Sequence, residues 1–408
     1  MAKKPNIRFA GFEDDWEQRK LGDYLEVSKQ KNKRESFGRE DVLSVSGEFG
    51  IVNQIEFQGR SFAGVSVANY GVVEYGDVVY TKSPLKSNPY GIVKTNKGKS
   101  GIVSTLYAVY KPKNNVESEF VQIYFESDFR MNTYMHPLVN KGAKNDMKVS
   151  DENALKGPVV FPQIEEQRVI SQYFKQLDHL ITLHQRKCDE LKKVKKFMLQ
   201  KMFPKKGEKN PEIRFDGFTN DWEQRKLSEL LEKYEDPVEI PHDGYERVGI
   251  RSHAKGTFHS FVEPGKELNT AKMHRVAADK FILNITFAWE HAVAITDEND
   301  AGKLVSHRFP QFSFNPELKS HFFKYLMLDK KFKEHLELSS PGGAGRNRVL
   351  KISDMLKYEI KLPSIEEQVK IGEYFDKLDT LITLHQRKSE ELKNVKKYML
   401  QNMFAKGE

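Results

Sequence analysis

The sequence is poor in cysteine and in long apolar segments. Its 408 residues include one cysteine, Cys188, which excludes an intramolecular disulfide and fits a reducing compartment. The most apolar window, Phe281 to Ile295, is about 15 residues long and contains Asn284, Glu290 and His291, so it is too short and too polar to cross a bilayer. The N-terminal MAKKPNIRF carries charge with no apolar segment behind it, and no secretory signal is expected. We therefore expect a cytoplasmic protein with no membrane partner.

The common enzyme signatures are also missing. The chain has no HExxH, GxSxG or paired Cys-x-x-Cys, and PGGAGR at Pro341 does not continue into the Gly-Lys-Ser/Thr of a phosphate-binding loop. SNPYG at Ser87 is similar to the Asn-Pro-Pro-Tyr loop of adenine methyltransferases. It lacks the second proline and has no accompanying glycine-rich methyl-donor motif, which favours a simple turn. We expect a chain that recognises a partner without catalysis and holds no metal ion or cofactor of its own.

Composition indicates a folded, basic protein. Hydrophobic residues make up 38% and aromatic residues 11% of the chain, and the mean hydropathy is −0.64. These values fit a globular protein with much polar surface better than a disordered one. The net charge of +8 favours a polyanionic partner, although many soluble proteins are equally basic without binding nucleic acid.

The chain contains a repeat of about half its own length. DWEQRKL at Asp15 to Leu21 recurs letter for letter at Asp221 to Leu227, and LITLHQRK at Leu180 to Lys187 recurs at Leu381 to Lys388. This spacing is far longer than the roughly 20 to 50 residues of a solenoid repeat and indicates duplication of a whole domain. Between the repeated segments the two halves share little. One scaffold that carries two interchangeable recognition domains explains this pattern; drift of the middle regions after duplication is the alternative.

Each half ends in a segment with the apolar spacing of a long helix. The first extends from Glu165 to Phe203, about 39 residues or roughly 58 Å, after Pro162 and before the stop signal Pro204. The two copies of the apolar stripe are Ile170, Tyr173, Phe174, Leu177, Leu180, Ile181, Leu191, Val194 and Met198, and Ile371, Tyr374, Phe375, Leu378, Leu381, Ile382, Leu392, Val395 and Met399. Because so narrow a stripe needs a partner, we expect an antiparallel intramolecular coiled coil with pseudo-twofold symmetry. Packing of each helix on its own domain alone is the alternative.

Polar residues interrupt the stripe at His184 and Lys187, and again at His385 and Lys388. In a symmetric antiparallel pair the two histidines meet near the centre, where a polar break fixes the register at a cost in stability. A surface for another protein is a second interpretation. A metal site is the weakest interpretation, because the usual spacing of ligands is missing.

The variable regions, residues 22–160 and 228–361, are predicted to be rich in strands. Runs of β-branched and aromatic residues bounded by glycine and proline begin at Val42, Gly71, Gly101 and Lys280. Helical patterns follow around Glu119 to Met131 and Glu317 to Leu336. The expected class is α/β or α+β, with two mixed, strand-rich domains joined by the two long helices.

Each variable region ends in a basic, glycine-containing loop: KGAKNDMKVS from Lys141 and PGGAGRNRVLKIS from Pro341. Glycine permits close approach to a duplex, and Arg, Lys and Asn offer donors to guanine, phosphate and adenine. TKSP at Thr81 and RSHAK at Arg251 have similar chemistry, and an ordinary solvated loop is the alternative for each. Trp289 could stack on a base, although tryptophan more often lies in a core. The predicted DNA contacts are Lys82, Ser83, Lys141, Lys144, Asn145, Arg251, Lys255, Arg346, Asn347 and Arg348.

Together these features resemble the specificity (S) subunits of type I restriction-modification enzymes. The resemblance covers essentially the whole chain and includes the alternation of variable and repeated regions. Its specific motifs are P-x-I-E-E-Q at Pro162 and Pro363, YF-x-x-LD-x-LITLHQRK at Tyr173 and Tyr374, and GDVVYTKS at Gly76. The second copy has ADKFILNIT in place of the last motif, which puts any residue-level correspondence there in doubt.

The resemblance implies that each variable domain is a target recognition domain that reads one half of a bipartite, asymmetric DNA site. It implies that the helices act as a spacer and as docking surfaces for two methyltransferase (M) subunits, which bind S-adenosylmethionine and methylate adenine. Restriction (R) subunits are then expected to add ATP-driven translocation and cleavage, with ATP and Mg²⁺ held by partner subunits. The implied domains are residues 1–160 and 205–361, each with its repeat segment, and the helices 161–204 and 362–408.

Two other hypotheses remain at this point. A cytoplasmic coiled-coil scaffold with two protein-binding domains predicts no salt-dependent DNA binding, whereas contacts to phosphates weaken steeply with salt. A self-sufficient nuclease or methyltransferase needs the motifs that are missing, and a methyl-transfer assay on the isolated chain tests it.

Overall fold

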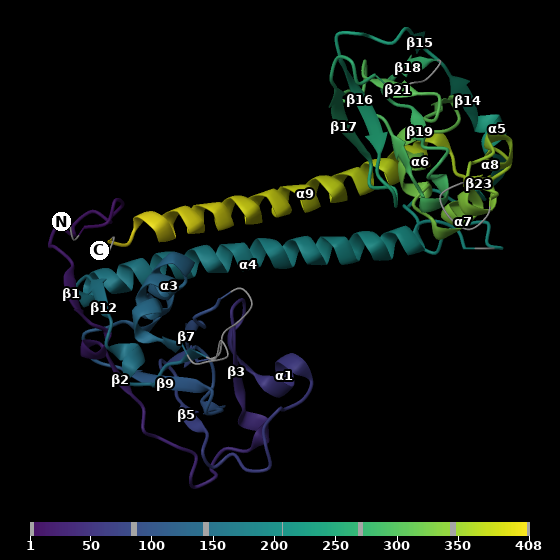
Figure 1. The fold of residues 1–408 in the computed structure, drawn as a ribbon. Helices are drawn as coiled ribbons and strands as arrows, with labels where there is room; N and C mark the ends of the chain where they lie inside the picture. The colour runs from purple at the N-terminus through teal and green to yellow at the C-terminus, as the bar shows by residue number, and fades with distance from the viewer. Residues whose placement is uncertain are drawn as a thin grey trace. The chain divides into compact units, whose positions relative to one another are not determined.

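The computed structural model describes residues 4–82, 88–141, 147–205, 207–267, 272–342 and 348–405. The chain forms two compact units (Figure 1). Unit 1 comprises Met1–Gln185 together with Arg387–Glu408, and unit 2 comprises Arg186–Gln386. Each unit therefore contains one variable region and half of each long helix. The expected domain division, which separates residues 1–160 and 205–361 from the helices 161–204 and 362–408, stays a prediction.

Unit 1 is built on a four-stranded antiparallel sheet with the order β2-β9-β6-β7. The strand pairs β1-β12, β3-β4, β5-β8 and β10-β11 accompany this sheet. The strands are β1 (Glu17–Lys20), β2 (Leu25–Val27), β3 (Leu43–Ser46), β4 (Gly50–Asn53), β5 (Gly71–Val73), β6 (Val78–Thr81), β7 (Val93–Thr95), β8 (Gly101–Val103), β9 (Tyr107–Pro112), β10 (Asn140–Lys141), β11 (Met147–Lys148) and β12 (Pro158–Phe161). The helices are α1 (Gln54–Gln58), α2 (Ser118–Phe125) and α3 (Asp128–Met135), with 3-10 turns η1 (Leu21–Asp23), η2 (Arg39–Asp41), η3 (His136–Leu138) and η4 (Asn153–Leu155).

Unit 2 contains a similar four-stranded sheet, β14-β22-β19-β20, and a further five-stranded sheet, β15-β18-β21-β16-β17, in which only β16 and β21 are parallel neighbours. The strands are β13 (Glu223–Lys226), β14 (Leu231–Tyr234), β15 (Pro237–Val238), β16 (Tyr245–Ile250), β17 (Thr257–Val262), β18 (Met273–Arg275), β19 (Phe281–Leu283), β20 (Val293–Ile295), β21 (Leu304–Ser306), β22 (Gln311–Phe314) and β23 (Glu359–Leu362). The helices are α5 (Leu227–Leu230), α6 (Ser320–Leu326), α7 (Lys330–Leu338) and α8 (Ile352–Met355), with the 3-10 turn η5 (Ala288–Glu290).

The repeated DWEQRKL sequence forms the same feature in both units. Its EQRK letters are β1 and β13, which pair antiparallel with β12 and β23 just before the long helices. The tryptophans that precede these strands, Trp16 and Trp222, are buried. The repeated segment therefore pairs with the strand before the long helix in both units, and the expected mixed, strand-rich class is confirmed.

The regions predicted to be helical, around Glu119 to Met131 and Glu317 to Leu336, each contain two helices: α2 and α3 in unit 1, and α6 and α7 in unit 2. In unit 1 the break falls at Ser127, whose hydroxyl accepts a hydrogen bond from Arg130 N as the N-cap of α3. In unit 2 it falls at Asp329, whose carboxylate accepts from Lys331 N over 3.1 Å at the start of α7. Ser and Asp are favoured N-caps because they satisfy the free amides of a first turn, and each starts a new helix here.

The long helices are α4 (Ile164–Lys201) and α9 (Ile365–Asn402), and the bounds of α4 lie within two residues of the expected Glu165 to Phe203. In unit 1, the first part of α4 packs antiparallel against the last part of α9 (Figure 1). Asp178 and Lys396 form an ion pair over 2.7 Å there. In unit 2 the other halves pair in the same register through Lys195 and Asp379, 2.5 Å apart. The expected antiparallel coiled coil is confirmed, and packing of each helix on its own domain alone is excluded.

The apolar stripe of the helices was predicted correctly in part. Ile170, Phe174 and Leu177 are buried, and so are their counterparts in α9. Leu180 is 40% and Val194 44% exposed, and Leu381 and Val395 are both 42% exposed. These four positions lie outside the seam because a straight helix has 3.6 residues per turn, so a broad apolar pattern covers more of the surface than one partner helix can bury.

Each unit's core is completed by the end of a long helix that starts in the other unit. Phe404, just past α9, lies 5.5 Å from Phe120 and 6.1 Å from Phe174 of unit 1, measured between ring centroids. Phe203, just past α4, lies 5.6 Å from Phe322 and 6.2 Å from Phe375 of unit 2. The repeated Met-Phe letters are therefore core residues.

A buried ion pair joins the repeat segment to the start of each long helix. Arg8 binds Glu166 in unit 1 through two hydrogen bonds of 2.7 Å. Arg214 binds Glu367 in unit 2 in the same bidentate way. The P-x-I-E-E-Q motif is thus explained by structure, since its second glutamate holds the preceding chain. Among the described residues, no helix is both long and apolar enough to span a membrane.

Candidate nucleic-acid interface

The turn between β16 and β17 in unit 2 carries the RSHAKG sequence and is held on the η5 segment. His253 and Ala254 have positive φ angles of 62° and 51°, a conformation that is strained for residues other than glycine. Their amides are fixed from outside the turn. His253 N donates to Glu290 O over 2.9 Å, and Ala254 N donates to His291 O over 2.8 Å. The turn therefore has a defined position.

Two predicted DNA contacts lie on this turn. The Arg251 guanidinium lies 5.3 Å from the ring centroid of Phe258 and donates to Thr257 O. Stacking on an aromatic ring orients the planar guanidinium while leaving most of its donors accessible. Lys255 is exposed near the tip of the same turn. The turn thus presents one oriented cation and one exposed cation.

A third predicted contact, Arg348, lies against the same η5 segment. Its guanidinium is 5.4 Å from the ring centroid of Trp289 and 3.6 Å from a carboxylate oxygen of Glu337. Leu350 N donates to Ile285 O over 2.8 Å and fixes the chain that carries the arginine. Trp289 is half-buried and supports a cation. Arg251, Lys255 and Arg348 are therefore carried by segments that contact η5 or the residues next to it, and we name these three residues the η5 cation cluster.

The η5 segment is itself anchored in the core of unit 2. His291, directly after η5, is buried and its Nε2 lies 2.8 Å from Met327 O. Burial lowers the pKa of His291 below its ordinary value, although the hydrogen bond to Met327 opposes this shift. A neutral ring is expected at physiological pH, so this histidine serves as a support and the surface charge comes from the cluster.

The predicted contacts of unit 1 are placed less favourably. The Lys82 ammonium forms an ion pair with Asp151 over 3.0 Å, and both side chains are about three-quarters buried, with relative exposures of 25% and 26%. Lys141 lies in β10, opposite Met147 of β11. Five predicted contacts lie outside the described residues: Ser83, Lys144, Asn145, Arg346 and Asn347. Contact with DNA stays a prediction for every one of these residues.

Sequence reasoning missed an exposed aromatic group in unit 1. Phe49 and Phe57 have ring centroids 5.2 Å apart, and the Arg60 guanidinium lies 4.6 Å from the ring of Phe62. All three phenylalanines are exposed. They lie around the β3-β4 hairpin and α1. The signal in the sequence was phenylalanine among polar residues, which breaks the alternation expected of a core strand.

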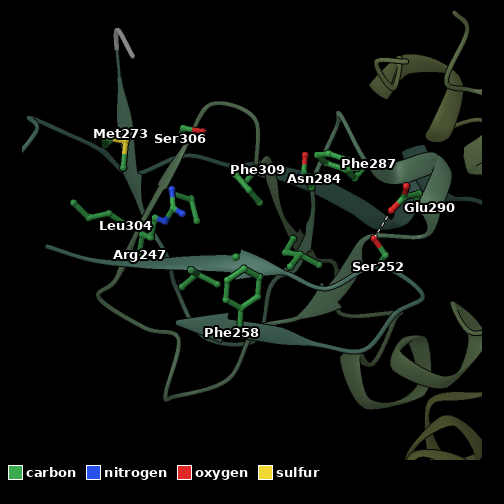
Figure 2. A pocket seen from close by; sticks show the side chains of 14 residues that line it. Arg247, Ser252, Phe258, Met273, Asn284, Phe287, Glu290, Leu304, Ser306 and Phe309 are labelled. Carbon is green, nitrogen blue, oxygen red and sulfur yellow. Dashed lines mark hydrogen bonds between the residues drawn. The ribbon is translucent and has the colours of Figure 1, made fainter. Parts of the chain in front are cut away.

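A cavity in unit 2 was also missed. It encloses about 310 Å³ and is lined by parts of β16, β17, β18 and β21 and by the η5 segment (Figure 2). Ser252 and Glu290, which flank the η5 cation cluster, belong to its wall. The alternation in TFHSFV at Thr257 could have revealed the hairpin, but not the cavity, because that depends on distant strands.

The two histidines of the polar break are half-buried on the long helices. His184 belongs to unit 1 and His385 to unit 2. Their mutual contact stays a prediction. The next seam positions, Cys188 and its counterpart Ser389, are buried, so the polar stretch continues along the seam for another turn.

Comparison with known proteins gives consistent results. A family model described as the type I restriction modification DNA specificity domain matches residues 13–193 and again residues 219–394. The type I restriction enzyme MjaVIII specificity subunit of Methanocaldococcus jannaschii is 25% identical over 327 residues, which cover 76% of this chain and 75% of that protein. A crystal structure of the S subunit of a type I restriction-modification system from M. genitalium superposes with a TM-score of 0.58 at 11% identity, over 99% of this chain and 100% of that one, a likeness that concerns the fold alone.

Proposed function

Because the chain belongs to the family of type I restriction-modification specificity subunits, we propose that each of its variable regions reads one half of a bipartite, asymmetric DNA site. The observation that carries this proposal is that the family model matches the chain twice, while the two variable regions differ in sequence. The repeated segments place two recognition domains in equivalent positions. Because the two variable regions differ in sequence, we expect the two half-sites to differ as well. The net charge of +8 is consistent with a polyanionic partner.

The η5 cation cluster is the best-supported contact region of unit 2. The guanidinium groups of Arg251 and Arg348 each lie against an aromatic ring, which orients donors suited to a phosphate or to a base edge. Lys255 is exposed, which suits a phosphate contact that positions the protein. In unit 1 the exposed aromatic group with Arg60 is the corresponding candidate.

The long helices offer a docking surface for partner subunits. In unit 1, Leu180 and Leu183 of α4 and Val395 and Tyr398 of α9 are exposed apolar side chains. We name them the unit 1 helix patch. The register set by Lys396 brings Leu180 and Val395 to nearly the same level of the pair. Exposed apolar groups of this kind mark protein interaction sites.

Unit 2 carries the equivalent set. Leu381 and Leu384 of α9 and Val194 and Phe197 of α4 are exposed in the same way, because they occupy the same positions of the repeat. Two equivalent patches suit two copies of one partner. We therefore infer that two M subunits dock on the helices.

The chemistry is assigned to the partners. The M subunits hold S-adenosylmethionine and methylate adenine, and the R subunits use ATP and Mg²⁺ for translocation and cleavage. This chain is then a recognition subunit without catalytic activity. The scaffold hypothesis finds no specific support in the family match.

The proposal is tested by methylome sequencing of a host that expresses this chain with its M subunit. We expect methylated adenines within one bipartite motif, together with DNA binding by the complex that weakens steeply as salt increases. Methylation with no defined motif, or binding that salt leaves unchanged, contradicts the proposal.

A further inference from the structure

The cavity of unit 2 shares residues with the surroundings of the η5 cation cluster. Phe258, whose ring lies near the Arg251 guanidinium, and Glu290 of η5 both line it. Figure 2 shows Ser252, Glu290, Asn284 and Phe287 at one end of the cavity and Arg247, with several apolar side chains, toward the other. Its volume is about 310 Å³, at the lower end of the roughly 300 to 1,000 Å³ of small-molecule pockets. A ligand the size of a single nucleoside base matches this space.

The walls are suited to a flat, apolar surface. Phe258 lies across Gly249, since a Cβ built at Gly249 would come within 2.3 Å of the Phe258 ring. Phe258 is 38% and Phe287 39% exposed, although both line a cavity. Phe309 adds a third ring to the wall. Exposed rings around a concave space offer stacking surfaces for a planar ligand.

The polar groups are divided between the two ends. Glu290 accepts a hydrogen bond from the Ser252 hydroxyl over 2.6 Å, and its carboxylate has capacity for further donors. The Arg247 guanidinium, which donates to Ser260 Oγ over 2.9 Å through Nε, provides additional donors. A planar ligand that carries an amino group on one edge and a carbonyl group on another fits both ends. Cytosine, guanine and adenine all carry the amino group, and the first two also carry the carbonyl group.

The position of the cavity connects this ligand to DNA. Arg251 stacks on Phe258, a wall residue, and precedes Ser252, another wall residue. Its accessible donors are suited to the phosphate next to a base that enters the cavity. Arg251 is therefore placed to bind DNA next to the cavity.

We propose that this cavity holds one nucleobase that unit 2 swings out of the duplex. The base stacks on Phe258 and presents its amino edge to Glu290. This proposal rests on the proposed recognition of DNA and adds a way to read one position of the second half-site. It differs from the extrusion of the adenine that a methyltransferase modifies, because the pocket belongs to this chain.

The test is a mismatch scan with the complex of the full chain and its M subunit. Duplexes carry the methylome-defined site with one mismatch at each position of the second half-site, and the dissociation constant is measured by fluorescence anisotropy. A base that is already unpaired costs less to extrude. We expect a mismatch at one position other than the methylated adenine to tighten binding by about fivefold or more.

The variants assign that gain to the cavity. Phe258→Ala removes the stacking surface, and Glu290→Gln keeps the size of the side chain while changing its charge. We expect both to abolish the gain at this position and to leave any gain at the methylated adenine unchanged. The matched control is Phe261→Ala, which removes an exposed ring from the opposite face of the same strand and should retain the gain.

The outcomes separate the two proposals. If the unmodified complex binds no DNA specifically, the proposed function fails. If it binds specifically but shows no gain, or gains only at the methylated adenine, the cavity proposal is overturned. A gain that survives in Glu290→Gln and Phe258→Ala also overturns it. Thermal melting identifies a variant that does not fold, and the near-isosteric Glu290→Gln then decides.

Discussion

The ring of Phe404 lies 5.5 Å from the ring of Phe120, although one residue follows the second long helix and the other lies in the first variable region. Arg130 strengthens this link, since its guanidinium donates to Leu400 O over 2.7 Å and lies 4.3 Å from the Phe404 ring. The first variable region is therefore packed against the end of the helix that comes last in the sequence.

Removal of the Phe404 ring should destabilise unit 1 strongly. The side chain is 2% exposed, and truncation of a buried phenylalanine to alanine typically costs about 3–5 kcal/mol because it leaves a cavity. We expect Phe404→Ala to lower the free energy of unfolding of unit 1 by this amount in chemical denaturation. Tyr398→Ala on the exposed face of α9 is the control and should cost less than about 1 kcal/mol. Equal losses in the two variants would show that the terminal ring is not part of the core.

Acid should weaken the attachment of α9 to unit 1. Burial raises the pKa of Glu126, but the ammonium groups of Lys396 and Lys94 outweigh it and hold the pKa below its ordinary value. A carboxylate with a depressed pKa contributes stability above its unfolded pKa, and this contribution disappears as pH falls through the folded pKa. We expect the stability of unit 1 to decline below about pH 4.5.

The matched variant is Glu126→Gln, which keeps the hydrogen-bonding shape without the charge. Its stability near neutral pH should be lower than that of the unmodified chain, and its decline in acid should be shallower. Parallel pH profiles from denaturant titration would contradict this role for Glu126.

Substitutions in the η5 cation cluster should affect DNA binding in two different ways. Lys255→Ala should weaken binding to all sequences alike and reduce the slope of log K against log salt by about 1, as expected of a phosphate contact. Arg348→Ala should relax the choice of one base in the second half-site, at a cost of about 1–3 kcal/mol for the preferred sequence. Competition binding at several salt concentrations measures both effects. Lys330→Ala, an exposed lysine on α7, is the control that should leave both unchanged.

The helix patches should bind the partner subunit. Leu180→Glu with Tyr398→Glu places charges in the unit 1 helix patch while leaving the buried seam intact. We expect this double variant to bind one M subunit in place of two in native mass spectrometry, with binding at unit 2 retained. Retention of two M subunits by this variant would remove the patches from the interface.

The long helices were predicted from the sequence more accurately than the residues of the candidate DNA-contact surface. Ile170, Phe174 and Leu177 were identified as helix seam because a helical period is a local property of the chain, and the core position of each has been confirmed. Leu180 and Val194 were assigned to the same seam wrongly, since an exposed apolar side chain of a helix can have the same spacing as one that faces the neighbouring helix.

The surface residues depended on contacts that no local pattern contains. Lys82 is held by Asp151, which lies far along the chain. The cavity of unit 2 needs β16 and β21 as parallel neighbours, a pairing between distant segments. Arg251 was predicted as a DNA contact from its basic turn, but the neighbouring ring of Phe258 was not foreseen, because cross-strand register decides which residue lies there.

Exchange of one variable region tests the central claim most directly. Residues 22–160 are replaced by those of another family member, and the methylome is sequenced in a host that supplies the M subunit. If the two variable regions recognise DNA independently, one half of the bipartite motif should change while the other half keeps its sequence. A motif altered in both halves, or unaltered in both, would contradict the account.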